Sequence, residues 1–132
     1  MPRGTVVIAE DHGDLRFTLR ELLEQEGYCA LEARDGKEAL RLLAETPLPC
    51  LLILDLMMPK LSGWDVLRAL PDTGKRVPVI VTSAFEGDWM DEVRRFDSVV
   101  ATMRKPPDVN ALVALVETHC PPLEVSQAVR EG

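Results

Sequence analysis

Runs of consecutive aliphatic residues recur along the chain and alternate with segments whose apolar residues fall at helical spacing. Such runs predict strands that are buried on both faces, which occur in parallel sheets covered by helices. The predicted strands span 5–9, 28–33, 51–54, 77–82 and 99–103. Their alternation with helical segments predicts an α/β fold, in which a doubly wound parallel sheet lies between two helical layers and has right-handed crossovers.

Five helices are expected, each bounded by residues that start or stop helices. They run from an Asp14 N-cap to Gly27, from the Asp35-Gly36 turn to Pro47, from Trp64 to Leu70, from Gly87-Asp88 through Phe96, and from an Asp108 N-cap to about His119. The length of 132 residues suits one domain. Because Pro121-Pro122 follows the last helix, we predict a packed domain over 1–120 and a loosely ordered tail over 121–132.

Acidic residues follow two of the predicted strands. Glu10-Asp11 comes directly after the first strand, and Asp55 comes directly after the third. In an open parallel sheet, ligands bind beyond the carboxyl ends of the strands, so these acids are expected at one edge. Three carboxylates in one crevice repel one another, and a hard divalent cation such as Mg²⁺ relieves this repulsion. Taken alone, Glu10-Asp11 also fits a solvated loop or a helix cap.

Composition narrows the class of protein. The net charge of −7 and the isoelectric point of about 4.8 argue against direct nucleic-acid binding, which needs clustered positive charge. Cys29, Cys50 and Cys120 lack CxxC spacing and are odd in number, which favours reduced thiols over disulfides or a zinc site. The chain shows no signal region and no apolar stretch of roughly 20 residues, so we expect a cytoplasmic protein without membrane association.

Polar residues at four strand ends form a recognisable set. They are Glu10-Asp11, Asp55 with Met58-Pro59 and Gly63 after it, Ser83-Ala84, and Lys105-Pro106. This set resembles the receiver domains of bacterial response regulators, the phosphoacceptor halves of two-component signalling systems, over about residues 5–119. The resemblance implies a flavodoxin-like (βα)5 fold with strand order 2-1-3-4-5.

The resemblance also implies roles for the residues at this edge. Asp55 would be the nucleophile that accepts a phosphoryl group and becomes an aspartyl phosphate. Asp11, Asp55 and the main-chain carbonyl of Met57 would bind Mg²⁺ or Mn²⁺, and Glu10 would act through a bound water. Lys105 would provide positive charge to a phosphoryl oxygen.

Ser83 would be the switch hydroxyl, which donates a hydrogen bond to the phosphoryl group and draws the following loop toward it. Thr82 is the competing choice. In the family pattern the hydroxyl residue directly precedes a small residue, so Ser83-Ala84 is the better match and Thr82 would be the last strand residue.

Other positions depart from the family pattern. Thr102 stands where many receivers carry an aromatic switch residue, and Ser98-Val99 replaces the usual small pair before the fifth strand. Met57 and Phe85 occupy the positions that tune dephosphorylation in the family. Both are apolar and cannot orient an attacking water, so slow loss of the phosphoryl group is predicted.

Three functions remain for these residues. The resemblance implies a single-domain response regulator in which phosphorylation of Asp55 changes a protein-binding surface. A sensor histidine kinase or phosphotransfer protein would act upstream and an effector protein downstream. It would not be an enzyme beyond its own phosphoryl transfer and slow autodephosphorylation. A homodimer through the face of the fourth helix, fifth strand and fifth helix is compatible with this function.

Two alternatives follow from particular positions. A degenerate receiver that binds partners irrespective of phosphate is favoured by Thr102 and Ser98-Val99. A phosphohydrolase of the haloacid-dehalogenase type would need a second acid two residues after its nucleophile, where this chain has Met57.

Overall fold

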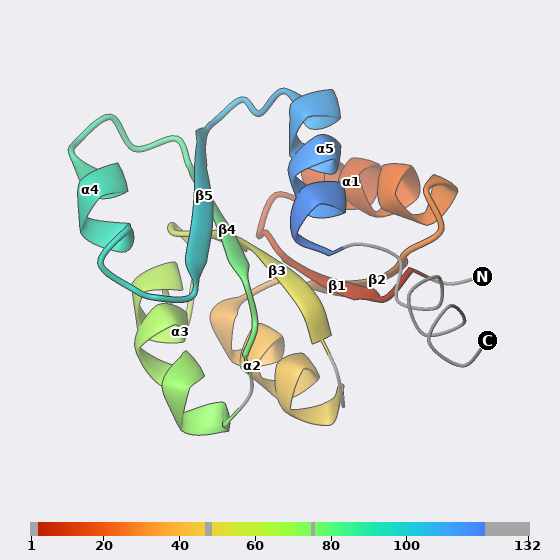
Figure 1. The fold of residues 1–132 in the computed structure, drawn as a ribbon. Coiled ribbons are helices and arrows are strands. Elements are labelled where there is room, and N and C mark those ends of the chain that lie inside the picture. The colour runs from red at the N-terminus through yellow and green to blue at the C-terminus, as the bar shows by residue number, and fades with distance from the viewer. Residues whose placement is uncertain (1–2, 47–48, 75, 121–132) are drawn as a thin grey trace.

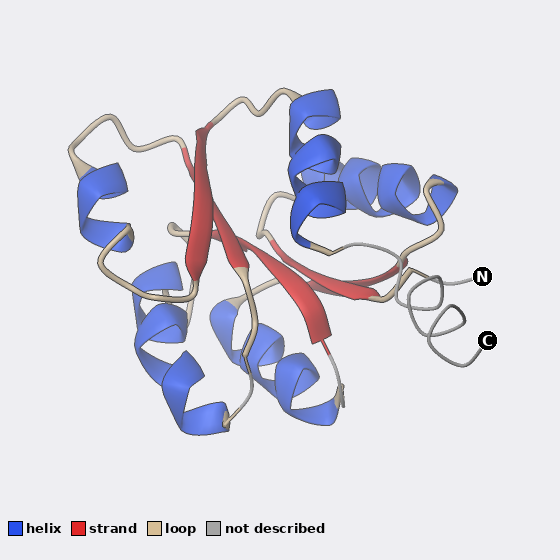
Figure 2. Cartoon of the chain, viewed as in Figure 1, coloured by secondary structure: helices blue, strands red, loops and turns tan. Residues whose placement is uncertain are grey.

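The chain folds around one five-stranded parallel sheet, as a computed structural model that describes residues 3–46, 49–74 and 76–120 shows (Figures 1 and 2). The strands are β1 (Thr5–Ala9), β2 (Cys29–Ala33), β3 (Pro49–Asp55), β4 (Val79–Ser83) and β5 (Val99–Arg104). Their order is β2-β1-β3-β4-β5, and every neighbouring pair is parallel. The predicted fold class and strand order are therefore confirmed.

Helices cover both faces of the sheet and form the two outer layers. They are α1 (Gly13–Gln25), α2 (Gly36–Glu45), α3 (Gly63–Ala69), α4 (Trp89–Val93) and α5 (Val109–His119), with a 3-10 turn at Leu70–Thr73. In Figure 1, α1 and α5 lie on one face of the sheet, and α2 and α3 lie on the other.

The strands contribute to a separate core on each face. Because successive side chains of a strand point to opposite faces, Val7 and Leu52 pack in the core with α2 and α3, whereas Ile8 and Ile53 pack with α1 and α5. This burial on both faces accounts for the uninterrupted aliphatic runs in the sequence.

Several predicted boundaries differ from those observed. Asp14 is not the N-cap of α1 but lies in its first turn, because the helix starts at Gly13 and the Nδ1 atom of His12 accepts from the N–H of Leu15 at 3.5 Å. Strand β4 begins at Val79 rather than at residue 77, and it ends at Ser83 rather than at residue 82. Helix α4 is a short segment that ends three residues before the predicted position.

The cysteines differ in state. Cys120 is fully buried at the end of α5 and is disulfide-bonded, so the prediction of reduced thiols is wrong for this residue. Cys29 is a free, exposed thiol. The side chain of Cys50 and the predicted tail over 121–132 lie outside the described residues. Within the described ranges, none of the helices combines the length and the apolar character that a membrane span requires.

Candidate functional site

Three carboxylates meet at the carboxyl edge of the sheet. In the pairing of β1 with β3, Ala9 lies opposite Leu54, so the next residues, Glu10 and Asp55, lie side by side at the carboxyl ends of these strands. Glu10, Asp11 and Asp55 each present a carboxylate oxygen within 4.8 Å of those of the other two. Glu10 and Asp55 are only 2% and 3% exposed, whereas Asp11 is exposed. The sheet thus brings together the acids that the sequence places after two separate strands.

Lys105 brings a positive charge to the two buried acids. Its Nζ lies 2.6 Å from Oε1 of Glu10 and 3.0 Å from Oδ2 of Asp55. The main-chain N–H of Lys105 donates to the carbonyl of Ser83 at 3.0 Å, which fixes the start of the segment after β5 beside the end of β4. One ammonium group therefore serves two carboxylates.

This arrangement shifts the protonation equilibria. Burial and, to a smaller extent, the negative charge of Glu10 raise the pKa of Asp55 from 3.8 to about 7. The N–H of Met57 and the charge of Lys105 act in the opposite direction without offsetting the rise. Burial alone would lower the pKa of Lys105, but its hydrogen bonds to Glu10 and Asp55, together with their charges, raise it above 10.5.

Asp55 is buried by its neighbours and still borders an open cleft. The cleft has a volume of about 720 Å³ and is lined by Asp11, Lys105 and Pro107 in addition to Asp55 and Met57. Oδ1 of Asp55 accepts a hydrogen bond from the N–H of Met57 at 3.1 Å, and Oδ2 faces Lys105. Both carboxylate oxygens are thus oriented by donors, and a small molecule has a route to them.

Gly63 supports the segment that carries Asp55. Its N–H donates to the carbonyl of Leu56 at 2.9 Å. A Cβ at this position would lie 2.6 Å from the Cα of Leu56 and 2.7 Å from the carbonyl oxygen of Asp55, closer than side chains tolerate. The glycine is therefore required by close packing of α3 against the end of β3.

Ser83 and Thr82 both lie at the end of β4. Thr82 pairs with Asp55 in the sheet, and Ser83 is fully buried. The Ser83 hydroxyl accepts from the N–H of Phe85 at 3.1 Å, which connects it to the loop before α4. Met57 and Phe85 are 60% and 55% exposed and line a second small pocket of about 190 Å³.

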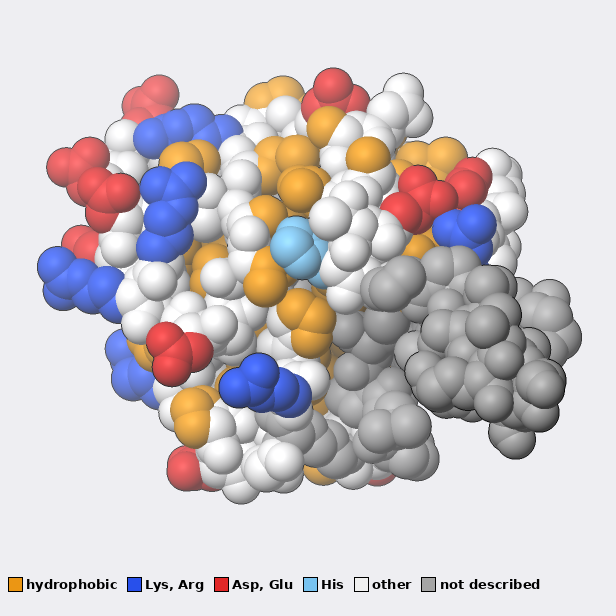
Figure 3. Space-filling model, viewed as in Figure 1, with side chains coloured by type: hydrophobic (Ala, Val, Ile, Leu, Met, Phe, Trp, Pro, Cys, Tyr) orange, Lys and Arg blue, Asp and Glu red, His pale blue; other side chains and the backbone are white. Residues whose placement is uncertain are grey.

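Thr102 does not join the carboxylates. It lies in the middle of β5, and its hydroxyl oxygen is 3.1 Å from a guanidinium nitrogen of Arg94, which donates to it from the end of α4. The loop before α4 is held instead at the carbonyl of Phe85, which accepts from Nε1 of Trp89 at 2.9 Å and from Arg104 at 3.1 Å. Figure 3 shows Lys and Arg side chains between α4 and β5, and apolar side chains beside α5.

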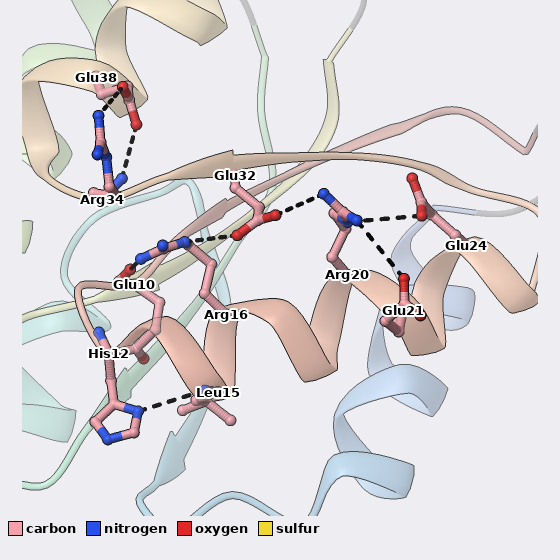
Figure 4. Close-up of polar contacts among 10 residues, drawn as sticks. All are labelled: Glu10, His12, Leu15, Arg16, Arg20, Glu21, Glu24, Glu32, Arg34 and Glu38. Atoms are coloured by element: carbon pink, nitrogen blue, oxygen red, sulfur yellow. Dashed lines mark hydrogen bonds and ion pairs between the residues drawn. The ribbon is translucent and has the colours of Figure 1, made fainter.

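Arg16 and Glu32 reach the site but were not singled out in the sequence. A guanidinium nitrogen of Arg16 donates to the carbonyl of Glu10 at 2.8 Å, and Nε of Arg16 donates to Glu32 at 2.8 Å (Figure 4). Glu32 is a lone acid in an otherwise apolar strand, and this could have indicated a partly buried ion pair. Arg16 gives no such signal, because arginine is ordinary in a helix.

The acids can hold a hard cation. They offer only oxygen ligands, which suits Mg²⁺ or Mn²⁺ and not a metal that prefers sulfur or imidazole. The exposure of Asp11 toward the cleft leaves room for water or a phosphate oxygen in the same coordination shell. The donor set therefore fits the predicted metal ion.

Known proteins resemble the chain in sequence. A family profile described as the response regulator receiver domain matches residues 6–117. The transcriptional regulatory protein PdtaR of Mycobacterium tuberculosis is 37% identical over 114 residues, which cover 85% of this chain and 54% of PdtaR. The transcriptional regulatory protein CpxR of Escherichia coli K12 is 42% identical over 88 residues, which cover 67% of this chain and 36% of CpxR. The chain thus spans about half or less of the length of these two relatives.

Solved structures agree with the sequence comparison. The receiver domain of a Francisella response regulator has a TM-score of 0.78 and 28% identity, and the match covers 87% of this chain and 94% of that domain. The signal receiver domain of a LuxO repressor protein from Vibrio parahaemolyticus has a TM-score of 0.79 and 26% identity, with 96% and 97% covered.

Proposed function

The chain belongs to the receiver domains of response regulators, and we propose that it accepts a phosphoryl group on Asp55. The donor would be the phosphohistidine of a sensor histidine kinase or phosphotransfer protein, or a small acyl phosphate. The observation that carries this proposal is the carboxylate of Asp55, which is buried, oriented by two donors and open to a cleft beside Asp11 and Lys105.

Transfer requires nucleophilic attack by an ionised carboxylate. An oxygen of Asp55 forms the new bond to phosphorus, while the bond from phosphorus to the donor nitrogen or oxygen breaks and its electron pair leaves with the donor. Lys105 favours the ionised form of Asp55 and, from the edge of the cleft, reaches an oxygen of the incoming phosphoryl group.

A divalent cation completes the site. Asp11, Asp55 and the main-chain carbonyl of Met57 would hold Mg²⁺ or Mn²⁺, with Glu10 acting through a water. When bound, the ion neutralises negative charge on the acids and on the phosphoryl oxygens. Glu10 is kept beside this position by Lys105 and by the N–H of His12, which donates to its Oε2 at 3.0 Å.

The protein would not turn over a separate substrate. Its chemistry would be confined to its own phosphorylation and a slow return to the free carboxylate, because Met57 and Phe85 offer no group that orients an attacking water. The apolar Met57 also argues against a phosphohydrolase that needs a second acid at this position.

The phosphorylated domain would signal through a changed protein-binding surface. Ser83 is linked to the loop before α4 through the N–H of Phe85, so a hydroxyl that turns toward a phosphoryl oxygen moves this loop. An effector protein would bind the face formed by α4, β5 and α5, and two copies of the chain could also dimerise through this face.

A receiver that binds partners irrespective of phosphate is the second candidate. The contact of Arg94 with Thr102 favours the phosphate-independent receiver. Thr102 stands where many receivers carry an aromatic switch residue, and here its hydroxyl is held by Arg94 instead.

Intact-mass analysis after incubation with Mg²⁺ and acetyl phosphate tests the proposal. The wild type should gain one phosphoryl group, and Asp55→Asn should gain none. Asp91→Asn, on the exposed surface of α4, is the matched control and should behave as the wild type. An unmodified wild type, also with phosphorylated histidine kinases as donors, would favour the phosphate-independent receiver.

A further inference from the structure

The peptide group between Glu10 and Asp11 is held by a side chain from α1. Arg16 donates to the carbonyl oxygen of Glu10 at 2.8 Å, while the N–H of Glu10 donates to the carbonyl of Ala33 at 3.1 Å. The Asp11 carboxylate itself has no hydrogen-bond partner among the described residues. Because the carbonyl of Glu10 and the N–H of Asp11 belong to one planar peptide, the contact with Arg16 fixes where the Asp11 side chain begins.

Arg16 is held in turn from the neighbouring strand. Its Nε donates to Oε1 of Glu32 at 2.8 Å, and the second oxygen of Glu32 accepts from Arg20 at 2.8 Å (Figure 4). The side chain of Arg16 is 14% exposed, so this contact is more shielded from water than an ordinary surface ion pair. The rigid guanidinium can donate in two directions at once, to a carbonyl and to a carboxylate.

Three elements converge on this guanidinium. Glu10 follows β1, Arg16 lies in the early part of α1, and Glu32 lies in β2 opposite Ile8 of β1. This network of hydrogen bonds therefore connects the loop between β1 and α1 to strand β2, beside the carboxyl ends of the strands where the acids lie.

We infer that Arg16 is a positioning residue for the metal site. It holds the Glu10-Asp11 peptide so that the Asp11 carboxylate is preorganised for a divalent cation, and Glu32 keeps the guanidinium in place. Arg16 itself contacts neither the cation nor the phosphoryl group. The inference rests on the proposed function, because it assigns the residue that prepares the same site.

The test separates the shape of the guanidinium from its charge. Arg16→Lys keeps the positive charge but loses the rigid fork in which two separate nitrogens donate to Glu10 and Glu32. Arg16→Gln loses both the charge and the fork, and Glu32→Gln weakens the ion pair that holds Arg16. Arg41→Gln is the matched control, because Arg41 pairs with Glu45 on the exposed side of α2 and its loss changes the net charge equally. For each variant of the 132-residue chain, amide resonances are followed by NMR during titration with Mg²⁺, and thermal unfolding is measured without metal.

We expect Arg16→Lys and Arg16→Gln to weaken Mg²⁺ binding by about tenfold, as is common for residues behind a metal ligand, and Glu32→Gln by less. Arg41→Gln should stay within twofold of the wild type. In the metal-free spectra, the Asp11 amide should shift in Arg16→Lys and not in Arg41→Gln.

A loss below fivefold in Arg16→Lys would overturn the inference, as would lowered thermal stability with unchanged Mg²⁺ affinity. If the wild type binds no Mg²⁺, the proposed function fails on its own. The positioning role is then decided by the metal-free Asp11 resonance: a shift in Arg16→Lys upholds it, and an unshifted resonance refutes it.

Discussion

Replacing Asp55 with asparagine should stabilise the metal-free protein at neutral pH. Asp55 and Glu10 are buried side by side, and the single ammonium of Lys105 serves both. Asparagine has nearly the same shape as aspartate, and its one amide oxygen can still accept from the N–H of Met57, whereas its NH2 group replaces the oxygen that accepts from Lys105. The substitution therefore removes one buried negative charge without opening a cavity.

The magnitude follows from the pKa of Asp55. A rise from 3.8 to about 7 corresponds to roughly 4 kcal/mol of destabilisation once the pH exceeds both values, since one unit is worth about 1.4 kcal/mol. The variant loses the charge-assisted hydrogen bond from Lys105, so we expect a net gain of roughly 2 kcal/mol at pH 7.5.

The pH dependence has a defined sign. Because the folded protein holds the Asp55 proton more tightly than the unfolded chain, wild-type stability falls as the pH rises from about 4 to about 7. Asparagine does not titrate. The difference in free energy of unfolding between Asp55→Asn and the wild type should therefore shrink as the pH is lowered through this window and nearly vanish at pH 4.

Urea unfolding in EDTA, monitored by circular dichroism at pH 7.5, 5.5 and 4, gives the required free energies. Asp91→Asn, which removes an exposed charge, serves as the control and should stay within about 0.5 kcal/mol of the wild type. The reasoning is refuted if Asp55→Asn is no more stable than the wild type at pH 7.5, or if its advantage is the same at pH 4.

Three further predictions concern single elements. Gly63→Ala places a Cβ 2.7 Å from the carbonyl oxygen of Asp55, so it should lower the free energy of unfolding by about 1–3 kcal/mol and slow phosphorylation by acetyl phosphate. Asp35→Ala removes the N-cap of α2 and should cost about 1 kcal/mol in urea unfolding at pH 7. The hydrogen bond from the N–H of the third helical residue lowers the pKa of Asp35, so this cost should disappear as the pH falls below the wild-type pKa. The double substitution Met57→Asn, Phe85→Glu should shorten the phosphoryl lifetime about tenfold by orienting water, and an equal lifetime by intact mass would contradict the prediction.

The sheet and the placement of its acids could be predicted because buried strands carry a strong sequence signal. The run that leads into Asp55 is apolar at every position, and its burial on both faces is what the structure shows. Where each of the first and third runs stops, an acid stands at the carboxyl end of the strand. The change of polarity therefore predicts that Glu10, Asp11 and Asp55 share one edge of the sheet, whereas Lys105 could be assigned to this site only through the resemblance to receiver domains.

The ends of helices and the contacts between residues far apart in the sequence carry a weaker signal. His12 rather than Asp14 caps α1, because the helix already begins at Gly13, and only the path of the loop decides which side chain reaches an N–H of the first turn. The role of Arg16 depends on Glu32 from another strand, a relation that spacing along the chain does not encode. Likewise, nothing local indicates that Thr102 accepts a hydrogen bond from α4.

The same pairing of strands that stabilises the sheet produces the unfavourable charge at its edge. Because Ala9 lies opposite Leu54, Glu10 and Asp55 are forced together, and Lys105 supplies one positive charge against two negative ones. The exposed Asp11 adds a third carboxylate at the mouth of the cleft. Stability of the metal-free domain and attraction for a cation therefore have one physical origin, and they should change in opposite directions. A substitution such as Asp55→Asn that relieves the repulsion must also weaken the binding of a divalent cation.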